Sequence, residues 1–279
     1  MTGDQTVALV GGAALGALAA RPWLKHAIAA APQGLTRKNY AGRSVPAVLG
    51  LPLLLGGLVG LGGVYLLQQT RALDVTSTRV ALASCVVVVV AALAGYADDR
   101  RGDEPARGFA GHIRAALGGR VTGGLVKIVG VGLAGLAAGL ILGGGWFALE
   151  LGVLIALSAN LVNLFDRAPG RAAKVVFAVG IVLFLLGDGA WSTVAGGFFG
   201  ALAVCAVADL GERAMLGDAG ANPLGALIGL GLGVSLGREG RWVVLVVLVV
   251  VNLASEKWSF SRGIERVGWL RALDRLGRG

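Results

Sequence analysis

Charged residues are scarce in this chain of 279 residues: Asp, Glu, Lys and Arg together make up 15% of it. Hydrophobic residues make up 56%, and the mean hydropathy is +0.77. This composition excludes an ordinary soluble globular protein and indicates a protein that resides in a lipid bilayer. The long apolar runs also exclude intrinsic disorder.

Cysteine is almost absent, and the two that occur, Cys85 and Cys205, each lie in an apolar stretch. We interpret them as buried free thiols and not as a disulfide or a metal-binding pair. The 48 glycines lack the three-residue period of collagen and lie within apolar runs, where membrane helices use small residues to pack closely. Fixed-period repeats and Pro-rich linkers are lacking as well, so we predict a single integral membrane domain over residues 1–279.

The apolar runs are long enough for transmembrane helices, each of which needs roughly 20 mostly apolar residues. We therefore predict an all-α, polytopic membrane helix bundle. Fewer, longer helices are the alternative. About nine windows qualify, near residues 5–20, 46–69, 79–97, 121–142, 146–164, 174–188, 191–208, 221–236 and 241–255.

Basic residues are missing before the first apolar run, and they follow it instead. This order argues against a signal peptide and favours a first span with its N-terminus outside. Nine alternating helices then place 20 of the 25 Lys and Arg residues on one side of the membrane. The positive-inside rule makes that side, and the C-terminus, cytoplasmic in a cell (plasma) membrane. The net charge of +9 therefore reflects topology, and no nucleic-acid partner is needed to explain it. The cytoplasmic segments are predicted near residues 21–45, 98–120, 165–174, 209–220 and 256–279.

The acidic residues of the predicted cytoplasmic side lie close to helix ends. In GYADDRRGD, Asp98 and Asp99 directly follow the third window. Two carboxylates at a membrane border are costly unless they are solvated, paired or bound to a cation. Neighbouring side chains diverge by about 100° on a helix, so the two acids can serve different tasks. A solvated helix end is the alternative interpretation.

A second polar constellation ends the fifth window, in ANLVNLFDRAPGRAAK. Asn160, Asn163 and Asp166 recur at a spacing of three, which places them on one helical face. Amides on an otherwise apolar membrane helix need a partner, so we expect either a functional or an interhelical contact. Three basic residues follow at once and are suited to binding pyrophosphate, unless they serve as positive-inside anchors: Arg167, Arg171 and Lys174.

The third constellation is MLGDAGANPLGALIG, in which Asp218 lies between Gly217 and Gly220. Small neighbours let a carboxylate and backbone amides approach a ligand closely. Asp218 also precedes the eighth window, where a helix N-terminus favours anions. The sequence leaves a helix cap and a metal ligand as equal alternatives for this residue.

In this order, the three motifs resemble those of the polyprenyl-phosphate N-acetylhexosamine-1-phosphate transferases, the superfamily of phospho-N-acetylmuramoyl-pentapeptide transferase, and an actinobacterial member in particular. That family carries an Asp-Asp pair, an Asn-x-x-Asn-x-x-Asp-Gly-x-Asp-Gly motif and a Gly-Asp-(Ser/Thr/Ala)-Gly motif. The stretch NYAGRSVPAVLG, with Arg43, Pro46 and Gly50, is also similar to its first cytoplasmic loop. The resemblance covers about residues 37–262.

The resemblance implies Mg²⁺-dependent transfer of a phospho-sugar from a UDP-sugar to a polyprenyl phosphate, with release of UMP, in the synthesis of cell-envelope glycan precursors. Asp218 and Asp99 are then the expected Mg²⁺ ligands. Asp98, Asp99 and Asp166 are the expected catalytic residues, and Asp98 positions the lipid phosphate or accepts its proton. The remaining polar residues are expected to bind substrate: Asn160, Asn163, Arg167, Arg171, Lys174, Lys127 and Arg43. A homodimer is compatible with the sequence.

Two departures from the family pattern lead to a second hypothesis. Pro169 replaces the later Asp of the second motif, and the histidine-rich loop is absent, since His26 and His112 are the chain's two histidines. A basic amphipathic tail with Trp258 and Phe260 follows instead, and is suited to a membrane interface. The alternative is a catalytically inactive relative that binds a lipid phosphate or serves as a scaffold. A transporter is a weaker alternative, because the motif acids gather at one membrane face and not at mid-helix depth.

Overall fold

The computed structural model describes residues 1–39, 42–70, 78–101, 111, 118–119 and 122–278. Most of the predicted loop 98–120 therefore lies outside the described residues. Within these described ranges the elements are helices, apart from one short antiparallel hairpin in which Arg37 pairs with Val45. In chain order they are α1 (Gly3–Ala29), η1 (Gln33–Leu35), β1 (Thr36–Lys38), β2 (Ser44–Pro46), α2 (Gly50–Gln69), α3 (Thr78–Arg101), α5 (Gly123–Leu142), α6 (Gly145–Phe165), α7 (Arg171–Leu186), α8 (Gly189–Leu210), α9 (Asp218–Ser235), α10 (Arg238–Lys257), α11 (Phe260–Arg266) and α12 (Gly268–Arg275).

Each of the nine apolar windows contains a helix, which confirms the positions predicted from hydropathy. Among the described residues, six helices are long and apolar enough to cross a membrane, and a seventh span is formed if α10 and α11 count together. The other two window helices are shorter, because α7 has 16 residues and α9 has 18. The protein is thus a polytopic helical bundle with six or seven clear spans, while nine spans remain a prediction.

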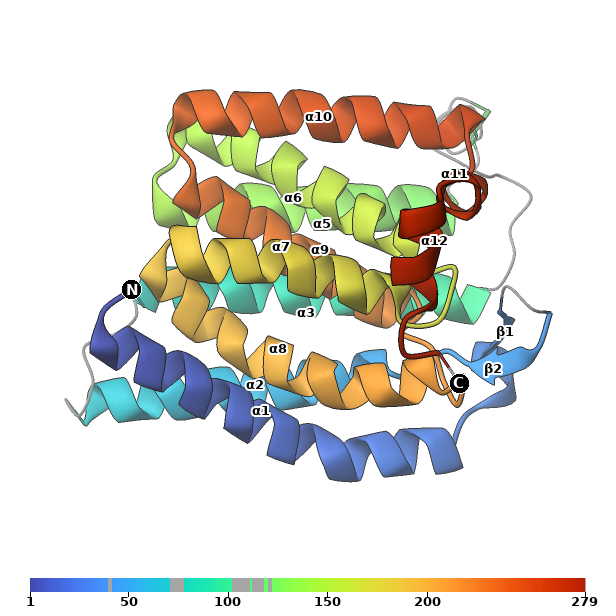
Figure 1. Ribbon diagram of the computed structural model, residues 1–279. Helices are drawn as coiled ribbons and strands as arrows, with labels where there is room; N and C mark the ends of the chain where they lie inside the picture. The colour runs from blue at the N-terminus through green and yellow to red at the C-terminus, as the bar shows by residue number, and fades with distance from the viewer. Residues whose placement is uncertain (40–41, 71–77, 102–110, 112–117, 120–121, 279) are drawn as a thin grey trace.

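The helices lie side by side along one axis, and the chain runs back and forth between the two ends of the bundle (Figure 1). One end holds the hairpin, α11, α12 and the C-terminus, and the other holds the N-terminus. The described parts of all five predicted cytoplasmic segments gather at the first end, which we call the motif end. Which end faces the cytoplasm remains a prediction.

Glycine allows the closest helix contacts, and one of these positions the candidate site. A Cβ on Gly95 of α3 would overlap the backbone carbonyl of Asp218 at the start of α9. Gly16 of α1 likewise lies directly against the backbone of Gly197 in α8. Such backbone-to-backbone contact is the way membrane helices pack without a hydrophobic driving force between them. The sequence therefore places the end of α3 against the start of α9.

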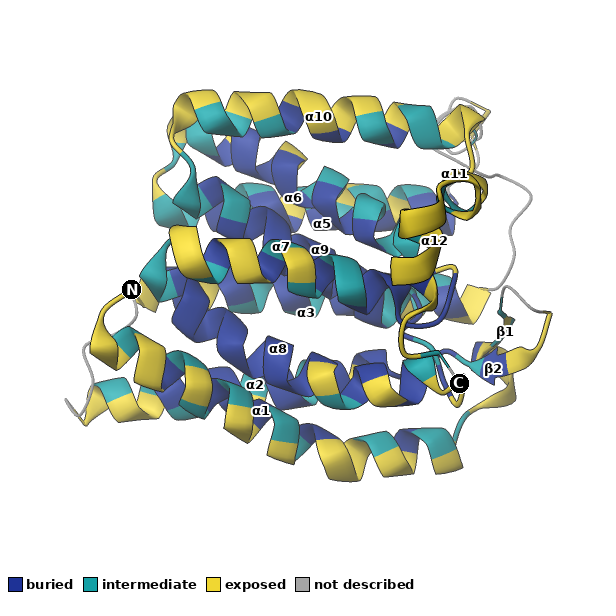
Figure 2. Ribbon diagram, viewed as in Figure 1, coloured by how far each residue is buried: buried dark blue, intermediate teal, exposed yellow. Residues whose placement is uncertain are grey.

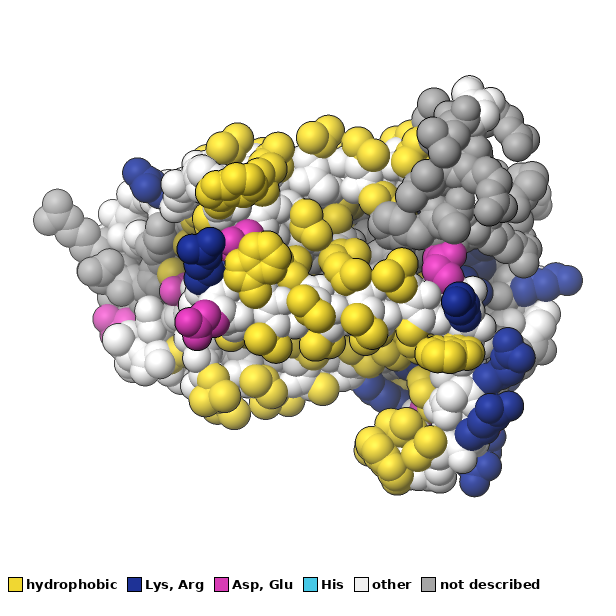
Figure 3. Space-filling model, turned by 90° about the horizontal axis from the view of Figure 1, so that it is seen from above, with side chains coloured by type: hydrophobic (Ala, Val, Ile, Leu, Met, Phe, Trp, Pro, Cys, Tyr) yellow, Lys and Arg dark blue, Asp and Glu magenta, His cyan; other side chains and the backbone are white. Residues whose placement is uncertain are grey.

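The outer surface is apolar between two charged ends. On α10, Val243, Val246, Val250 and Leu253 are exposed, whereas α8 is buried over most of its length (Figure 2). A space-filling view shows apolar side chains between charged groups near either end of the molecule (Figure 3). This distribution is the one expected of a protein surrounded by lipid at its middle and water at its ends.

Candidate functional site

Three helices bring charged side chains together at the motif end. Lys127, near the start of α5, donates from Nζ to Asp98 Oδ2 at 2.9 Å and also to Asp218 Oδ2. The Asp98 and Asp218 side chains are 21% and 22% exposed, and that of Lys127 is 11% exposed. We call these three residues the Lys127 centre. It joins the first and third sequence motifs and remains partly open to the surroundings.

Asp99 faces a different way from its neighbour Asp98. Its carboxylate accepts hydrogen bonds from the backbone amides of Asp218 at 3.2 Å and Ala219 at 2.9 Å, which are the first residues of α9. It therefore caps α9 from a neighbouring helix and satisfies amides that would otherwise lack a partner. The predicted divergence of the Asp pair is confirmed. The predicted role of Asp99 as a catalytic and metal-binding residue stays a prediction, and the contact observed here is structural.

The turn before α9 depends on glycine. Gly217 has a φ of +65°, and a Cβ there would meet Asp99 Oδ2 and the Ala47 side chain, each at 2.9 Å. Glycine accepts this left-handed conformation without strain and leaves the space that the approach of Asp99 requires. The GDAG motif therefore forms a tight turn that brings the Asp218 carboxylate to the Lys127 ammonium.

Asp166 lies in the turn after α6 and is buried at 9% exposure. Burial raises the pKa of this carboxyl well above its usual range, and the nearby acids Asp209, Asp218 and Asp99 raise it further. The amide of Gly217 opposes the shift through a hydrogen bond. Asp209 in turn accepts a hydrogen bond from the Gly170 amide at 3.1 Å. The second motif thus adds one carboxyl group, that of Asp166, within electrostatic range of Asp218 in the Lys127 centre, and Asp209 of α8 lies close to it.

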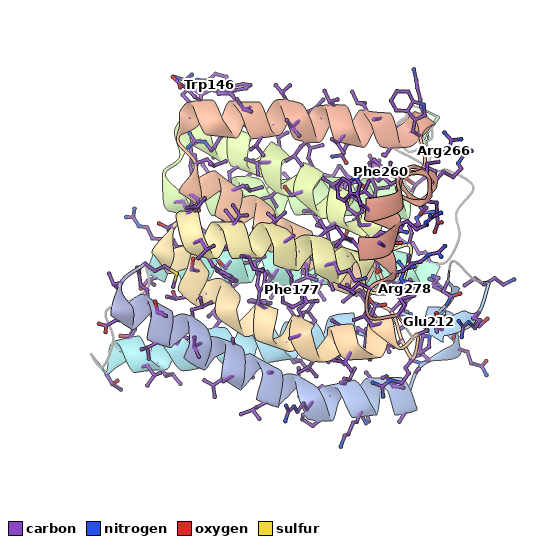
Figure 4. All side chains as sticks on the ribbon, in the orientation of Figure 1. Trp146, Phe177, Glu212, Phe260, Arg266 and Arg278 are labelled. Atoms are coloured by element: carbon purple, nitrogen blue, oxygen red, sulfur yellow. The ribbon has the colours of Figure 1, made fainter. Side chains whose placement is uncertain are left out.

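The cations predicted to bind pyrophosphate contact the C-terminal segment. Arg171 forms a two-pronged ion pair with Asp274 of α12, from Nε to Oδ1 at 2.7 Å and from Nη2 to Oδ2 at 2.8 Å. Lys174 donates to the backbone carbonyls of Leu273 and Asp274, and Arg278 pairs with Asp274 at 2.6 Å. Arg278 lies at the motif end close to α12 (Figure 4). Phosphate binding by Arg171 and Lys174 stays a prediction, and a protein carboxylate already satisfies Arg171 in this structure.

The Asn pair of the second motif divides between two environments. Asn160 donates to Asn252 Oδ1 of α10 at 2.7 Å, so its partner is interhelical, which is one of the two expected outcomes. Asn163 is half-buried one turn nearer the motif end. A small cavity beside Asn160 is lined by Lys127, Ile128, Val131, Ala156, Ala159, Asn160 and Asn222. The Nδ2 of Asn222 is buried and has no hydrogen-bond partner in the described part of the chain.

The remaining predicted substrate-binding residues lie on the surface. Arg167 is exposed. Arg43 follows the hairpin turn and pairs with Glu212 Oε2 at 2.8 Å. Glu212 also accepts a hydrogen bond from Asn39 at 2.7 Å, and it lies at the motif end in Figure 4. Arg43 therefore lies among the surface loops of the motif end, where its partner is Glu212.

Sequence reasoning missed three residues that the fold brings to the site. Arg37, on strand β1, donates from Nη2 to the backbone carbonyl of Asp99. Asn222 lines the cavity beside Lys127 and Asn160, and Asn252 holds Asn160 in place. An amide inside an apolar window was the available signal for Asn222 and Asn252. Arg37 carried no such signal, because basic residues are common throughout the predicted cytoplasmic segments.

The donor set fits a magnesium ion at one pair of residues. Among the residues that the structure describes, no group of three or more His, Cys, Asp or Glu side chains is arranged to hold a metal. Mg²⁺, however, is usually held by one or two carboxylates, with phosphates and waters completing its shell. Asp98 and Asp218 fit that requirement, since both reach one cation position, now held by the Lys127 ammonium. Asp99 fits less well because its oxygens serve α9.

Comparison with known proteins adds no family assignment. No protein-family model matches the chain, and no curated protein matches it. The motifs and the geometry at the motif end therefore carry the functional argument.

Proposed function

We propose that this protein is a Mg²⁺-dependent phosphotransferase that moves a phospho-sugar from a UDP-sugar to a polyprenyl phosphate and releases UMP. The observation that carries the proposal is the convergence of Asp98 and Asp218 on Lys127. These residues come from three helices, and the two acids lie 120 positions apart in the sequence. They belong to two of the three motifs that resemble the transferase family, and the third motif supplies Asp166 nearby.

The charges of the site support a cationic ligand. One ammonium faces two carboxylates in the Lys127 centre, and Asp166 and Asp209 add buried acids close by. Carboxylates gathered at low exposure repel one another, and the pKa of Asp166, raised by burial, is raised further by Asp209 and Asp218, so a bound dication would stabilise this arrangement. Magnesium bound by Asp98 and Asp218 would offset the negative charge of the substrate phosphates and of the departing UMP.

The chain's own groups also act on the substrates in this proposal. Lys127 can contact a phosphate oxygen with its ammonium when it leaves a carboxylate. Asp98 would, through the carboxylate oxygen that does not bind the ion, orient the polyprenyl phosphate or accept its proton. An oxygen of that phosphate then attacks the sugar-bearing phosphorus of the UDP-sugar, and the phosphorus–oxygen bond to UMP breaks. Asp99 caps the start of α9, and Arg37 binds the backbone carbonyl of Asp99 near the end of α3, so both residues keep these helix ends in position.

A second candidate rests on the contacts already made. The Lys127 ammonium holds both acids of its centre, and Asp274 holds Arg171. Ion pairs that are complete without a substrate are also expected of an inactive relative that binds a lipid phosphate or serves as a scaffold. The two candidates differ in turnover and not in lipid binding.

The test is an assay of the purified protein with polyprenyl phosphate, Mg²⁺ and a panel of UDP-sugars, in which UMP release is measured. Asp98→Asn and Asp218→Asn should each lower the rate by about 100-fold or more, because charge opposite the reacting phosphates is lost. Asp4→Asn, an exposed acid near the N-terminus, is the matched control. Unchanged rates in both site variants would overturn the proposal. Retained polyprenyl-phosphate binding without UMP release would favour the scaffold.

The orientation of the site needs its own experiment. We infer that the motif end faces the cytoplasm of a plasma membrane, because that end carries most of the basic residues. A reporter active only in the cytoplasm, fused after Arg278, should be active. A silent reporter there, together with an active one at the N-terminus, would invert the topology.

A further inference from the structure

The last two helices leave the direction of the bundle. The chain bends by 90° between α10, which ends at Lys257, and α11, which begins at Phe260. Because α10 runs along the bundle, α11 lies across it, and Figure 1 shows α11 nearly end-on beside α12 at the motif end. A helix perpendicular to the spans lies parallel to the bilayer plane.

Buried contacts fix this C-terminal segment, residues 259–278, to the bundle. Phe260 stacks on Phe165 of α6 with 5.3 Å between ring centroids, and Figure 4 shows Phe260 on the inner side of α11. Asp274 is paired with Arg171 and Arg278, with side-chain exposures of 4%, 6% and 9%. The segment is therefore held in one place, and its outward faces have a defined direction.

Those outward faces differ sharply in character. At 100° per residue, Trp269, Leu273 and Leu276 share one face of the α12 segment, and all three are exposed. Arg271 and Arg275 lie on another face, about 200–240° from Trp269, and are exposed as well. Asp274 lies between these faces and points into the bundle. The C-terminal segment, while held to the bundle by Asp274, thus exposes an apolar face and a basic face at the same time.

The apolar face continues the lipid-facing surface of the bundle. The exposed apolar side of α10 ends near Trp258, which is 71% exposed and lies at the bend. Trp269 is 67% exposed. In Figure 3 the part that projects from the motif end shows apolar side chains toward the middle of the molecule and basic side chains away from it. Tryptophan and arginine in this order are typical of the bilayer interface.

We propose that residues 258–278 form a docking surface for the anionic headgroup layer of the bilayer in which the bundle lies. Trp258, Trp269 and Leu273 enter the boundary between headgroups and acyl chains. The exposed arginines contact anionic headgroups: Arg262, Arg266, Arg271 and Arg275. Charge complementarity selects anionic over zwitterionic lipid, because each arginine near such a surface adds attraction that salt weakens. This surface does not depend on the proposed transferase activity.

The test uses full-length protein with Cys85→Ala, since Cys205 is buried, and a nitroxide label at Leu273→Cys or at Arg271→Cys. Each labelled protein is placed in nanodiscs of phosphatidylcholine alone or with about 30 mol% phosphatidylglycerol. Accessibility to oxygen, which enters lipid, is compared with that to a water-soluble nickel chelate. With phosphatidylglycerol, the oxygen-to-nickel ratio should be about threefold higher at Leu273 than at Arg271. Combined Arg262→Gln, Arg266→Gln and Arg275→Gln substitutions should remove the effect of phosphatidylglycerol at Leu273.

A second readout does not rely on labelling. Hydrogen exchange of residues 259–278 in the unmodified protein should slow when phosphatidylglycerol is added, and high salt should reverse the change. Equal exposure of both labelled positions to the nickel chelate, with exchange unaffected by lipid charge, would overturn the proposal. So would a Leu273 label that is shielded from both reagents, since this result identifies a second protein copy as the occupant.

Discussion

Two ion-pair centres at the motif end have opposite balances of charge. In the Lys127 centre one ammonium faces the two carboxylates of Asp98 and Asp218, whereas around Asp274 one carboxylate faces Arg171 and Arg278. The first is partly exposed, and the second is closed, with exposures of 9% or less. Among these residues, the first centre has one more negative charge than positive, and the second has one more positive charge than negative. The Lys127 centre is therefore the candidate catalytic site, whereas the ion pairs of Asp274 are a structural tether that holds residues 259–278 to the bundle.

The largest expected effect concerns the closed centre. Arg171→Ala leaves Asp274 buried with half of its partners, and breaking such a buried pair costs about 3–5 kcal/mol. We expect residues 259–278 to exchange hydrogen much faster and the free energy of unfolding in detergent to fall. Arg167→Ala, an exposed arginine four positions earlier, is the matched control and should change little. Equal hydrogen exchange and equal unfolding free energies in the two variants would show that the ion pairs of Asp274 do not hold residues 259–278 to the bundle.

A smaller effect distinguishes the two adjacent acids. Asp99→Ala removes the cap of α9, so we expect a loss of about 1–2 kcal/mol in the free energy of unfolding and faster exchange of the Asp218 and Ala219 amides. Asp98→Ala should leave both quantities near the values of the unmodified protein. If Asp98→Ala proved the more destabilising, the assignment of Asp99 to structure and Asp98 to the open centre would be reversed.

Acid should weaken the closed centre. Burial alone would raise the pKa of Asp274, but Arg171 and Arg278 outweigh it and lower that pKa below its ordinary value. Asp274 therefore contributes stability that is complete above the ordinary carboxyl pKa of about 3.9 and is lost as pH falls through the lowered value. Hydrogen exchange of residues 259–278 should be constant from neutral pH to about pH 5 and should increase below about pH 4, after correction for intrinsic rates. Asp274→Asn should remove this step.

The smallest effect is expected at the surface of the same segment. Glu265 and Arg275 pair at 3.2 Å, but their side chains are 48% and 62% exposed. Glu265→Gln should change the free energy of unfolding by less than about 1 kcal/mol. If Glu265→Gln lowered the free energy of unfolding as much as Arg171→Ala does, the exposed pair would be as stabilising as the buried ion pairs of Asp274.

Much of the fold could be predicted from hydropathy. All nine apolar windows contain helices, and GYADD and GDAG both lie at helix ends. Hydropathy predicts nine spans where six or seven are clear, because α7 and α9 are short and the first turns of α9 contain Asp218 and Asn222. Window hydropathy averages over such ends and does not show how deeply a short helix is placed in the bundle.

The roles of individual polar residues were harder to predict. The divergence of Asp98 and Asp99 followed from helix geometry, but their partners did not, since Lys127 and the amides of α9 lie far away in the sequence. The spacing of Arg171 and Lys174 in the sequence predicts that they form a local cluster suited to pyrophosphate. Their contacts with α12 depend on a residue about 100 positions later, Asp274. Local spacing carries no information about such contacts.

The amino-acid sequence by itself determined that this protein is a bundle of apolar helices, with basic and acidic residues gathered in the segments of one end. Hydropathy and charge act locally, so they can be read along the chain. The tertiary structure decided which carboxylate meets which cation. Glycine contacts such as that of Gly95 bring α3 against α9, and only that approach turns Asp99 into a cap and leaves Asp98 and Asp218 to share Lys127. Ion pairing depends on distances of a few ångströms between distant segments, and packing alone sets them.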